Sequence, residues 1–129
     1  AERFRDTNKR TTLFVQIETA EGVKNADAIA AIEGVDCLWV GHNDLSVSLG
    51  IPGEFDHKDF KKALAKTVAA ATKHNKSLGR LVPTVEQGIA IYDEGFDFIC
   101  YTGDVWLLHN ALQDGIARLR AGTKGKRKG

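Results

Sequence analysis

Four short apolar runs alternate with longer segments of helical periodicity along the chain. The runs cover residues 13–18, 37–41, 77–82 and 96–101. Nearly continuous apolar strands are typical of a parallel sheet whose faces are covered by the helices of βα crossovers. The pattern therefore predicts the α/β class.

Helical periodicity predicts four helices between and after these strands. They cover about residues 23–32, 58–74, 84–94 and 104–121. The second carries an apolar stripe at helical spacing, formed by Phe60, Leu64, Val68 and Ala71. We expect Thr84 to cap the third helix in a capping box, Asp104 to cap the fourth, and Gly122 to end it. The segment between the second strand and the second helix is expected to be a loop.

The length of 129 residues then limits the architecture. A complete (β/α)8 barrel takes about 250 residues, so four βα units need about 125. We predict one domain over residues 1–122 and a basic flexible tail over residues 123–129. A small doubly wound sheet, such as a receiver-like signalling module that binds Mg²⁺, fits the length as an alternative.

Charge and composition exclude several classes of protein. The net charge is +1, but the last six residues hold four cations, which leaves −3 for the rest. A body that binds nucleic acid normally has a basic face. No run approaches the roughly 18 apolar residues of a membrane span, and no secretory signal is visible. Cys37 and Cys100 lie in apolar runs and are expected to be reduced core thiols. We therefore expect a cytoplasmic protein with no nucleic-acid or membrane partner.

Polar side chains gather where the first two strands end. Alternation places Gln16 and Glu18 on the same face of the first strand, and Asp44 follows the end of the second. Ligands of parallel α/β folds bind at the carboxyl ends of the strands, and two carboxylates there can hold a hard divalent cation. A salt bridge of Glu18 and a helix cap by Asp44 are the structural alternatives.

The amino-acid sequences of these and several further segments resemble those of a known family. The similar motifs lie at residues 15–19, 41–50, 55–58, 83–87, 95–96 and 103–108. In this order and spacing they resemble the HpcH/HpaI aldolase family, which consists of metal-dependent class II aldolases acting on 2-oxo acids. The resemblance implies a (β/α)8 TIM barrel, of which this chain supplies about the last four βα units and the C-terminal helix.

The resemblance also implies the chemistry of the site. Glu18 and Asp44 would hold Mg²⁺, Mn²⁺ or Co²⁺, Gln16 would contact the substrate, and backbone amides around Asn43 and Asp44 would hold its carboxylate. The implied activity is that of a lyase. It cleaves a 4-hydroxy-2-oxo acid to pyruvate and an aldehyde through a metal-stabilised enolate, and oxaloacetate-like acids are related substrates.

The chain also departs from the family. His42 stands where the family usually has proline, and it is either an extra ligand or base or a surface histidine. The family's catalytic histidine and arginine belong to the first half of the barrel, so no catalytic residue is assigned here, His57, His74 and His109 included.

The resemblance implies two kinds of partner. One is an N-terminal half-barrel that completes the eight strands. The other is further copies of the chain, since in the family the final helix is exchanged between barrels of a hexamer. The alternative function is a catalytically incomplete half-barrel that acts as a structural or assembly subunit.

Overall fold

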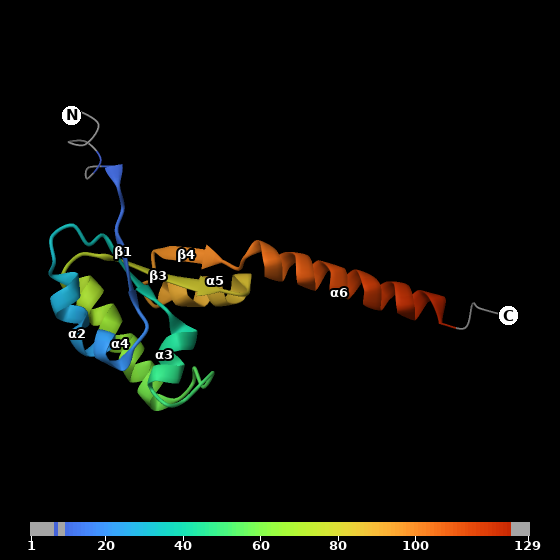
Figure 1. Cartoon of the computed structure of the whole chain (residues 1–129), viewed down its shortest axis with the longest axis horizontal. Coiled ribbons are helices and arrows are strands. Elements are labelled where there is room, and N and C mark those ends of the chain that lie inside the picture. The colour runs from blue at the N-terminus through green and yellow to red at the C-terminus, as the bar shows by residue number, and fades with distance from the viewer. Residues whose placement is uncertain (1–6, 8–9, 125–129) are drawn as a thin grey trace.

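The computed structural model describes residue 7 and residues 10–124. Its centre is a parallel sheet of four strands, which are β1 (Phe14–Ile17), β2 (Cys37–Val40), β3 (Ser77–Val82) and β4 (Phe98–Tyr101). The strands lie in sequence order, β1-β2-β3-β4 (Figure 1). A doubly wound sheet places its first strand inside the sheet. The doubly wound, receiver-like alternative is therefore wrong, and the sequential order is that of a half-barrel.

Five helices follow the strands. They are α2 (Ala20–Ala30), α3 (His42–Ser48), α4 (Lys58–Lys73), α5 (Val85–Asp93) and α6 (Asp104–Thr123). The short helix α3 lies in the segment predicted to be a loop; it extends over seven residues, of which Leu45 and Ser46 are buried. Helix α2 begins three residues before its predicted start. Helix α6 continues through Gly122, so the predicted stop at that glycine is wrong.

Side-chain caps define three of the helix starts; at α4 the ring Nδ1 of His57 accepts from the backbone N–H of Asp59 at 3.2 Å. The hydroxyl of Thr84 accepts from the backbone N–H of Gln87 at 3.2 Å, which confirms the predicted cap. The hydroxyl of Thr19 does the same for α2, accepting from Gly22 at 2.9 Å. The predicted cap of α6 is wrong, because Gly103 holds the cap position and Asp104 is the first helical residue.

The core lies between one face of the sheet and the helices α2 and α4. It includes Ile17, Leu38, Val40, Leu78 and Val82 of the strands. The predicted stripe of α4 meets these residues: Phe60 and Ala71 are buried, and Leu64 and Val68 are partly buried against the cluster. The alternation predicted for the first strand is confirmed, since Val15 and Ile17 face this core.

The opposite face of the sheet is open. Phe14 and Phe98 are 37% and 46% exposed, and with Trp39 they form a cluster of edge-on rings with centroids 4.8–6.4 Å apart. A shallow hollow among these rings also includes Gln16. In a closed barrel this face is the interior.

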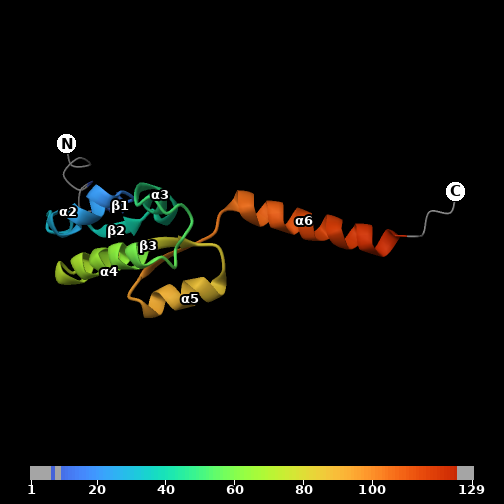
Figure 2. The ribbon, with the colours of Figure 1, turned by 90° about the horizontal axis from the view of Figure 1, so that it is seen from below.

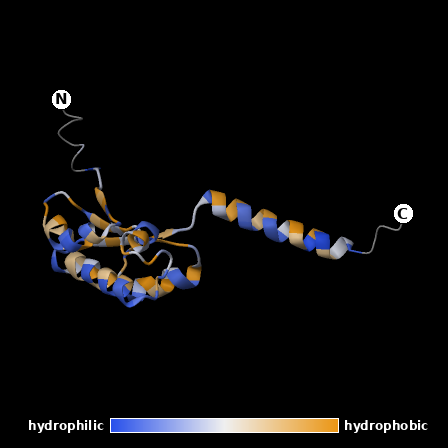
Figure 3. Ribbon diagram, turned by 60° about the horizontal axis from the view of Figure 1, so that its bottom comes forward, coloured by the Kyte–Doolittle hydropathy of each residue, from blue (hydrophilic) through white to orange (hydrophobic). Residues whose placement is uncertain are grey.

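Helix α6 leaves the body of the fold and projects away from it (Figure 2). None of its residues is buried. Apolar positions recur along its length (Figure 3), with Leu108, Leu112 and Leu119 between 56% and 69% exposed. The chain turns outward at Thr102, whose φ of 48° is in the left-handed region that a β-branched residue rarely adopts.

Both cysteines are free thiols; Cys37 is buried in the core as predicted, whereas Cys100 is only partly buried. Burial raises the pKa of Cys37 to about 11. Across the described part of the chain, no helix combines the length and apolar character that crossing a bilayer requires. Of the tail predicted at 123–129, Thr123 belongs to α6, and residues 125–129 lie outside the described residues.

Candidate functional site

The side chains of Gln16 and Glu18 meet at the carboxyl end of β1. The Gln16 Nε2 donates a hydrogen bond to Glu18 Oε2 at 2.6 Å. Both pack against the backbone of Gly41, where a Cβ would lie 2.8 Å from Gln16 Nε2 and 3.1 Å from Glu18 Oε2. Only glycine at position 41 allows this close approach, so the ends of β1 and β2 bring the pair together as predicted.

Asp44 is held by α3, which starts directly after Gly41. The helix is anchored by buried Leu45 and by Ser46, whose hydroxyl donates to Asn43 O at 2.6 Å and accepts from Gly53 N at 2.9 Å. Asp44 lies in the exposed first turn, and its carboxylate has no hydrogen-bond or ion-pair partner among the described residues. It does not cap the helix, so it remains available to a ligand.

A cavity of about 510 Å³ brings most of the predicted residues together. Gln16, Asn43 and Asp44 line it, and Glu18 adjoins it through its hydrogen bond to Gln16. The remaining walls are Trp39, Val40, Gly41, His42, Phe55, Leu81, Pro83, Thr102, Trp106 and Asn110. A space of this size accommodates a small organic molecule.

His42 lines the same cavity and is partly buried. Its ring meets the Phe55 ring edge-on with centroids 5.2 Å apart. Burial lowers the pKa of His42, the Arg80 charge lowers it further, and the Asp44 carboxylate opposes both. His42 is thus favoured as a neutral imidazole.

The donor chemistry of this end of the sheet fits a hard divalent cation. Two carboxylates, Glu18 and Asp44, and the amide of Gln16 provide oxygen atoms, the ligand type that Mg²⁺ and Mn²⁺ prefer. Within the described residues no group of three or more His, Cys, Asp and Glu is placed to hold a metal. If the two carboxylates alone held an ion, coordination positions would be left for water and substrate, as a catalytic ion requires.

Comparison with known proteins defines the class of this fold and site. The family model for HpcH/HpaI aldolase/citrate lyase matches residues 1–111. The chain belongs to this family. A 5-keto-4-deoxy-D-glucarate aldolase of Shigella boydii serotype 18 (strain CDC 3083-94 / BS512) is 39% identical over 113 residues, which cover 88% of this chain and 44% of the aldolase. The chain thus spans about half the length of the curated relatives that it matches.

Solved structures support the same family assignment. An HpcH/HpaI aldolase/citrate lyase family protein from Burkholderia cenocepacia J2315 is 31% identical with a TM-score of 0.86, over 92% of this chain and 46% of that one. The citrate lyase beta subunit of M. tuberculosis, complexed with oxaloacetate and magnesium, shares the fold at 19% identity and a TM-score of 0.55, over 71% of this chain and 47% of its own. The fold is therefore the half of a TIM barrel that the sequence predicted.

Sequence reasoning missed part of the cavity wall. Trp39, Phe55 and Trp106 all line the cavity, and none was predicted to. Trp39 is in register with Gln16 and faces the same open side of the sheet, and Gly79 beside it leaves room for the indole, since a Cβ there would come within 2.7 Å of it. A glycine paired with an aromatic residue on the neighbouring strand was the signal available in the sequence.

Proposed function

We propose that this chain is the half of a class II aldolase that carries the metal ligands, and that it cleaves a 4-hydroxy-2-oxo acid to pyruvate and an aldehyde when a second half completes the barrel. The observations that carry the proposal are the hydrogen bond between Gln16 and Glu18 beside Gly41 and the cavity that Gln16, Gly41 and Asp44 line together. The name of the Shigella relative adds 5-keto-4-deoxy-D-glucarate as a substrate to test.

In this proposal Glu18 and Asp44 hold the cation, and Mg²⁺ is supported by the family member described with magnesium and oxaloacetate. When bound, the cation acts as a Lewis acid toward the keto oxygen of the substrate. Gln16 orients the substrate beside it, and backbone N–H groups at Asn43 and Asp44 receive the substrate carboxylate. The indole of Trp39 forms part of the cavity wall.

The experiment compares three variants of the completed protein. Glu18→Gln and Asp44→Asn are expected to lose Mn²⁺ binding and pyruvate release together, while circular dichroism stays unchanged. Glu33→Gln removes an exposed carboxylate away from the cavity and serves as the matched control. Full activity of either site variant with Mg²⁺ or Mn²⁺ would show that the assigned ligands are wrong.

The acid–base group of the reaction is proposed to belong to the completing half-barrel. Among the described residues, no histidine besides His42 lines the cavity, and general acid–base catalysis is typically worth about 10²–10⁴-fold in rate. Free thiols at Cys37 and Cys100 are compatible with a reducing compartment such as the cytoplasm.

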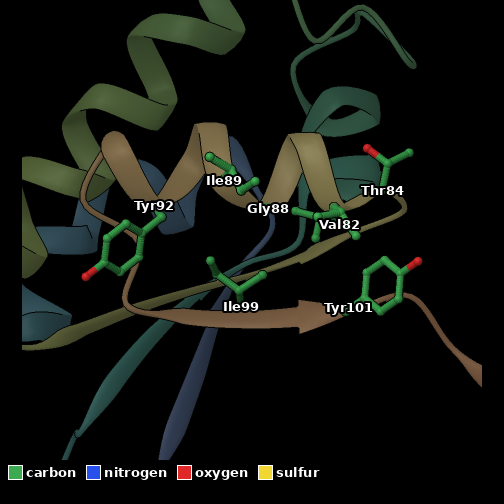
Figure 4. Close-up of a pocket in the computed structure, with 8 residues that line it drawn as sticks. Val82, Thr84, Gly88, Ile89, Tyr92, Ile99 and Tyr101 are labelled. Carbon is green, nitrogen blue, oxygen red and sulfur yellow. The ribbon is translucent and has the colours of Figure 1, made fainter.

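Assembly through α6 is the second part of the proposal. The helix offers an apolar stripe to a partner, and an apolar groove of about 340 Å³ lies between α5 and the strands β3 and β4 (Figure 4). Its lining includes Val82, Ile89 and Tyr92. A groove and a helix of matching character on each copy favour a homo-oligomer, a hexamer by family resemblance.

A purely structural role as an assembly subunit is the alternative function. The exposed surface of α6 favours it, because a partner could bind to this helix whether or not the chain catalyses a reaction. The two functions are separated by the variants above. For a purely structural subunit, Glu18→Gln and Asp44→Asn would leave its role in assembly unchanged and there would be no pyruvate release to lose. For an aldolase, both variants would lose pyruvate release.

A further inference from the structure

Arg80 is the one charged residue that β3 directs toward the helix layer. It pairs in register with Val40 and Ile99, on the face that carries the core and opposite to Gln16 and Trp39. Its guanidinium lies over the Phe55 ring at 6.0 Å from the centroid. Arg80 therefore belongs to the outer wall of the barrel, on the other side of the sheet from the open interior face.

The polar atoms of Arg80 are not satisfied by the protein. Nε is buried without a hydrogen-bond partner, and the described residues supply no hydrogen bond or ion pair to the guanidinium. Burial lowers the pKa of Arg80, and Glu94 partly restores it by charge attraction. A partly buried cation without a partner is unfavourable, and an anion with matching donors in reach would relieve that cost.

The guanidinium borders a separate cavity of about 580 Å³. One wall is the apolar side of α4, with Phe60, Leu64 and Val68, and Glu94 also lines the cavity. Lys61 also lines it, but its ammonium is paired with Asp56 at 2.9 Å. The cavity thus combines the guanidinium of Arg80 with a long apolar wall.

We propose that this cavity binds a small monocarboxylate, with its carboxylate on Arg80 and its apolar part along α4. A planar carboxylate matches the fork of donors of a guanidinium. The Glu94 carboxylate in the same cavity disfavours a second negative charge, so a monoanion suits it better than a phosphate dianion. The site is distinct from the candidate metal site, although Phe55 lines both cavities.

The test uses hexanoate as the probe and 1-hexanol as its uncharged counterpart, with the complete chain in a chelating buffer. Methyl signals of Leu64 and Val68 in NMR spectra report the cavity directly. Hexanoate at millimolar concentration is expected to shift them saturably, and 1-hexanol is expected to bind at least about tenfold more weakly, because a hydrogen-bonded charge is typically worth a factor of this size.

Variants assign the carboxylate to Arg80. Arg80→Gln is expected to weaken hexanoate binding about tenfold or more, while Lys61→Gln, on the same cavity, leaves it nearly unchanged. Glu94→Gln is expected to tighten binding, which tests the charge balance even if Arg80→Gln fails to fold. Equal affinity for hexanoate and 1-hexanol, wild-type affinity in folded Arg80→Gln, weaker binding in Glu94→Gln, or no hexanoate shift overturns the proposal.

Discussion

The replacement Gly41→Ala examines how closely β1 and β2 approach at the candidate site. The added Cβ would lie 2.8 Å from both Gln16 Nε2 and Glu18 Cβ, which is 0.6 Å short of the 3.4 Å where ordinary van der Waals contact begins. The backbone at Gly41, with φ of −80°, is accessible to alanine. The cost therefore arises from crowding, and overpacking of this kind typically costs about 1–3 kcal/mol.

To relieve this 0.6 Å overlap, Glu18 must move by more than a metal site tolerates. Metal–ligand distances hold to about 0.2 Å, so a shift of Glu18 by several tenths of an ångström breaks the arrangement with Asp44. We expect Mn²⁺ affinity to fall about 10–100-fold, the range seen when groups that orient ligands are changed. The midpoint of urea unfolding is expected to fall as well.

The assay is Mn²⁺ binding followed by electron paramagnetic resonance, together with urea unfolding followed by circular dichroism. Gly115→Ala is the matched control, because a Cβ at Gly115 meets nothing within 4 Å. It lies in α6, where alanine is the better helix former, so stability should be equal or higher and Mn²⁺ affinity unchanged. Unaltered Mn²⁺ affinity in folded Gly41→Ala would refute the reasoning.

Three further predictions concern assembly, activity and pH, and a fourth concerns thiol chemistry. Leu112→Asp in the exposed stripe of α6 is expected to reduce the mass seen by light scattering, and a wild-type chain that is monomeric at high concentration would contradict it. The 129-residue chain alone is expected to release almost no pyruvate with Mn²⁺, and robust turnover by the pure chain would count against a completing half-barrel. Hydrogen bonds from Lys73 and then His74 hold the pKa of Asp27 below its ordinary value of 3.8. Their contribution to stability is therefore full above pH 3.8 and is lost as the pH falls through the lowered pKa. Asp27→Asn should reduce the acid-side decrease in the free energy of unfolding, measured as a function of pH. Iodoacetamide at neutral pH is expected to label Cys100 before Cys37, and mass spectrometry of the peptides decides the order.

Much of the fold follows from local sequence signals. The alternation of Gln16 and Glu18 with Val15 and Ile17 predicts which side chains share a face, and the 2.6 Å hydrogen bond bears this out. Such features depend on neighbours along one strand or helix, which periodicity records. Periodicity is therefore enough to predict the parallel α/β class, and the chain length together with the family motifs adds the half-barrel.

Other features depend on contacts between distant segments and were not predicted. Helix α3 is anchored by its buried residues Leu45 and Ser46, and the Ser46 hydroxyl accepts a hydrogen bond from the N–H of Gly53, seven residues further on; no periodicity is visible in so short an element. The outward path of α6 depends on the left-handed conformation of Thr102, which threonine rarely adopts. The position of Arg80 on the helix side follows from strand register, which the weaker third run did not make evident.

The strand that carries Gln16 and leads into Glu18 is also an edge of the sheet, since among the described residues β1 pairs only with β2. An edge strand offers its free backbone groups to another strand, so the completing half-barrel of the proposed function would join at the strand that leads into the proposed ligand Glu18. Association of the two halves and ion binding are then linked equilibria. If the ion binds the joined halves more tightly than the separate chain, a bound ion raises the association constant of the halves by that same factor. On the proposed function, chelation is therefore expected to weaken the association of the two halves in addition to stopping turnover, so that the supply of divalent cation would set how much completed barrel is present.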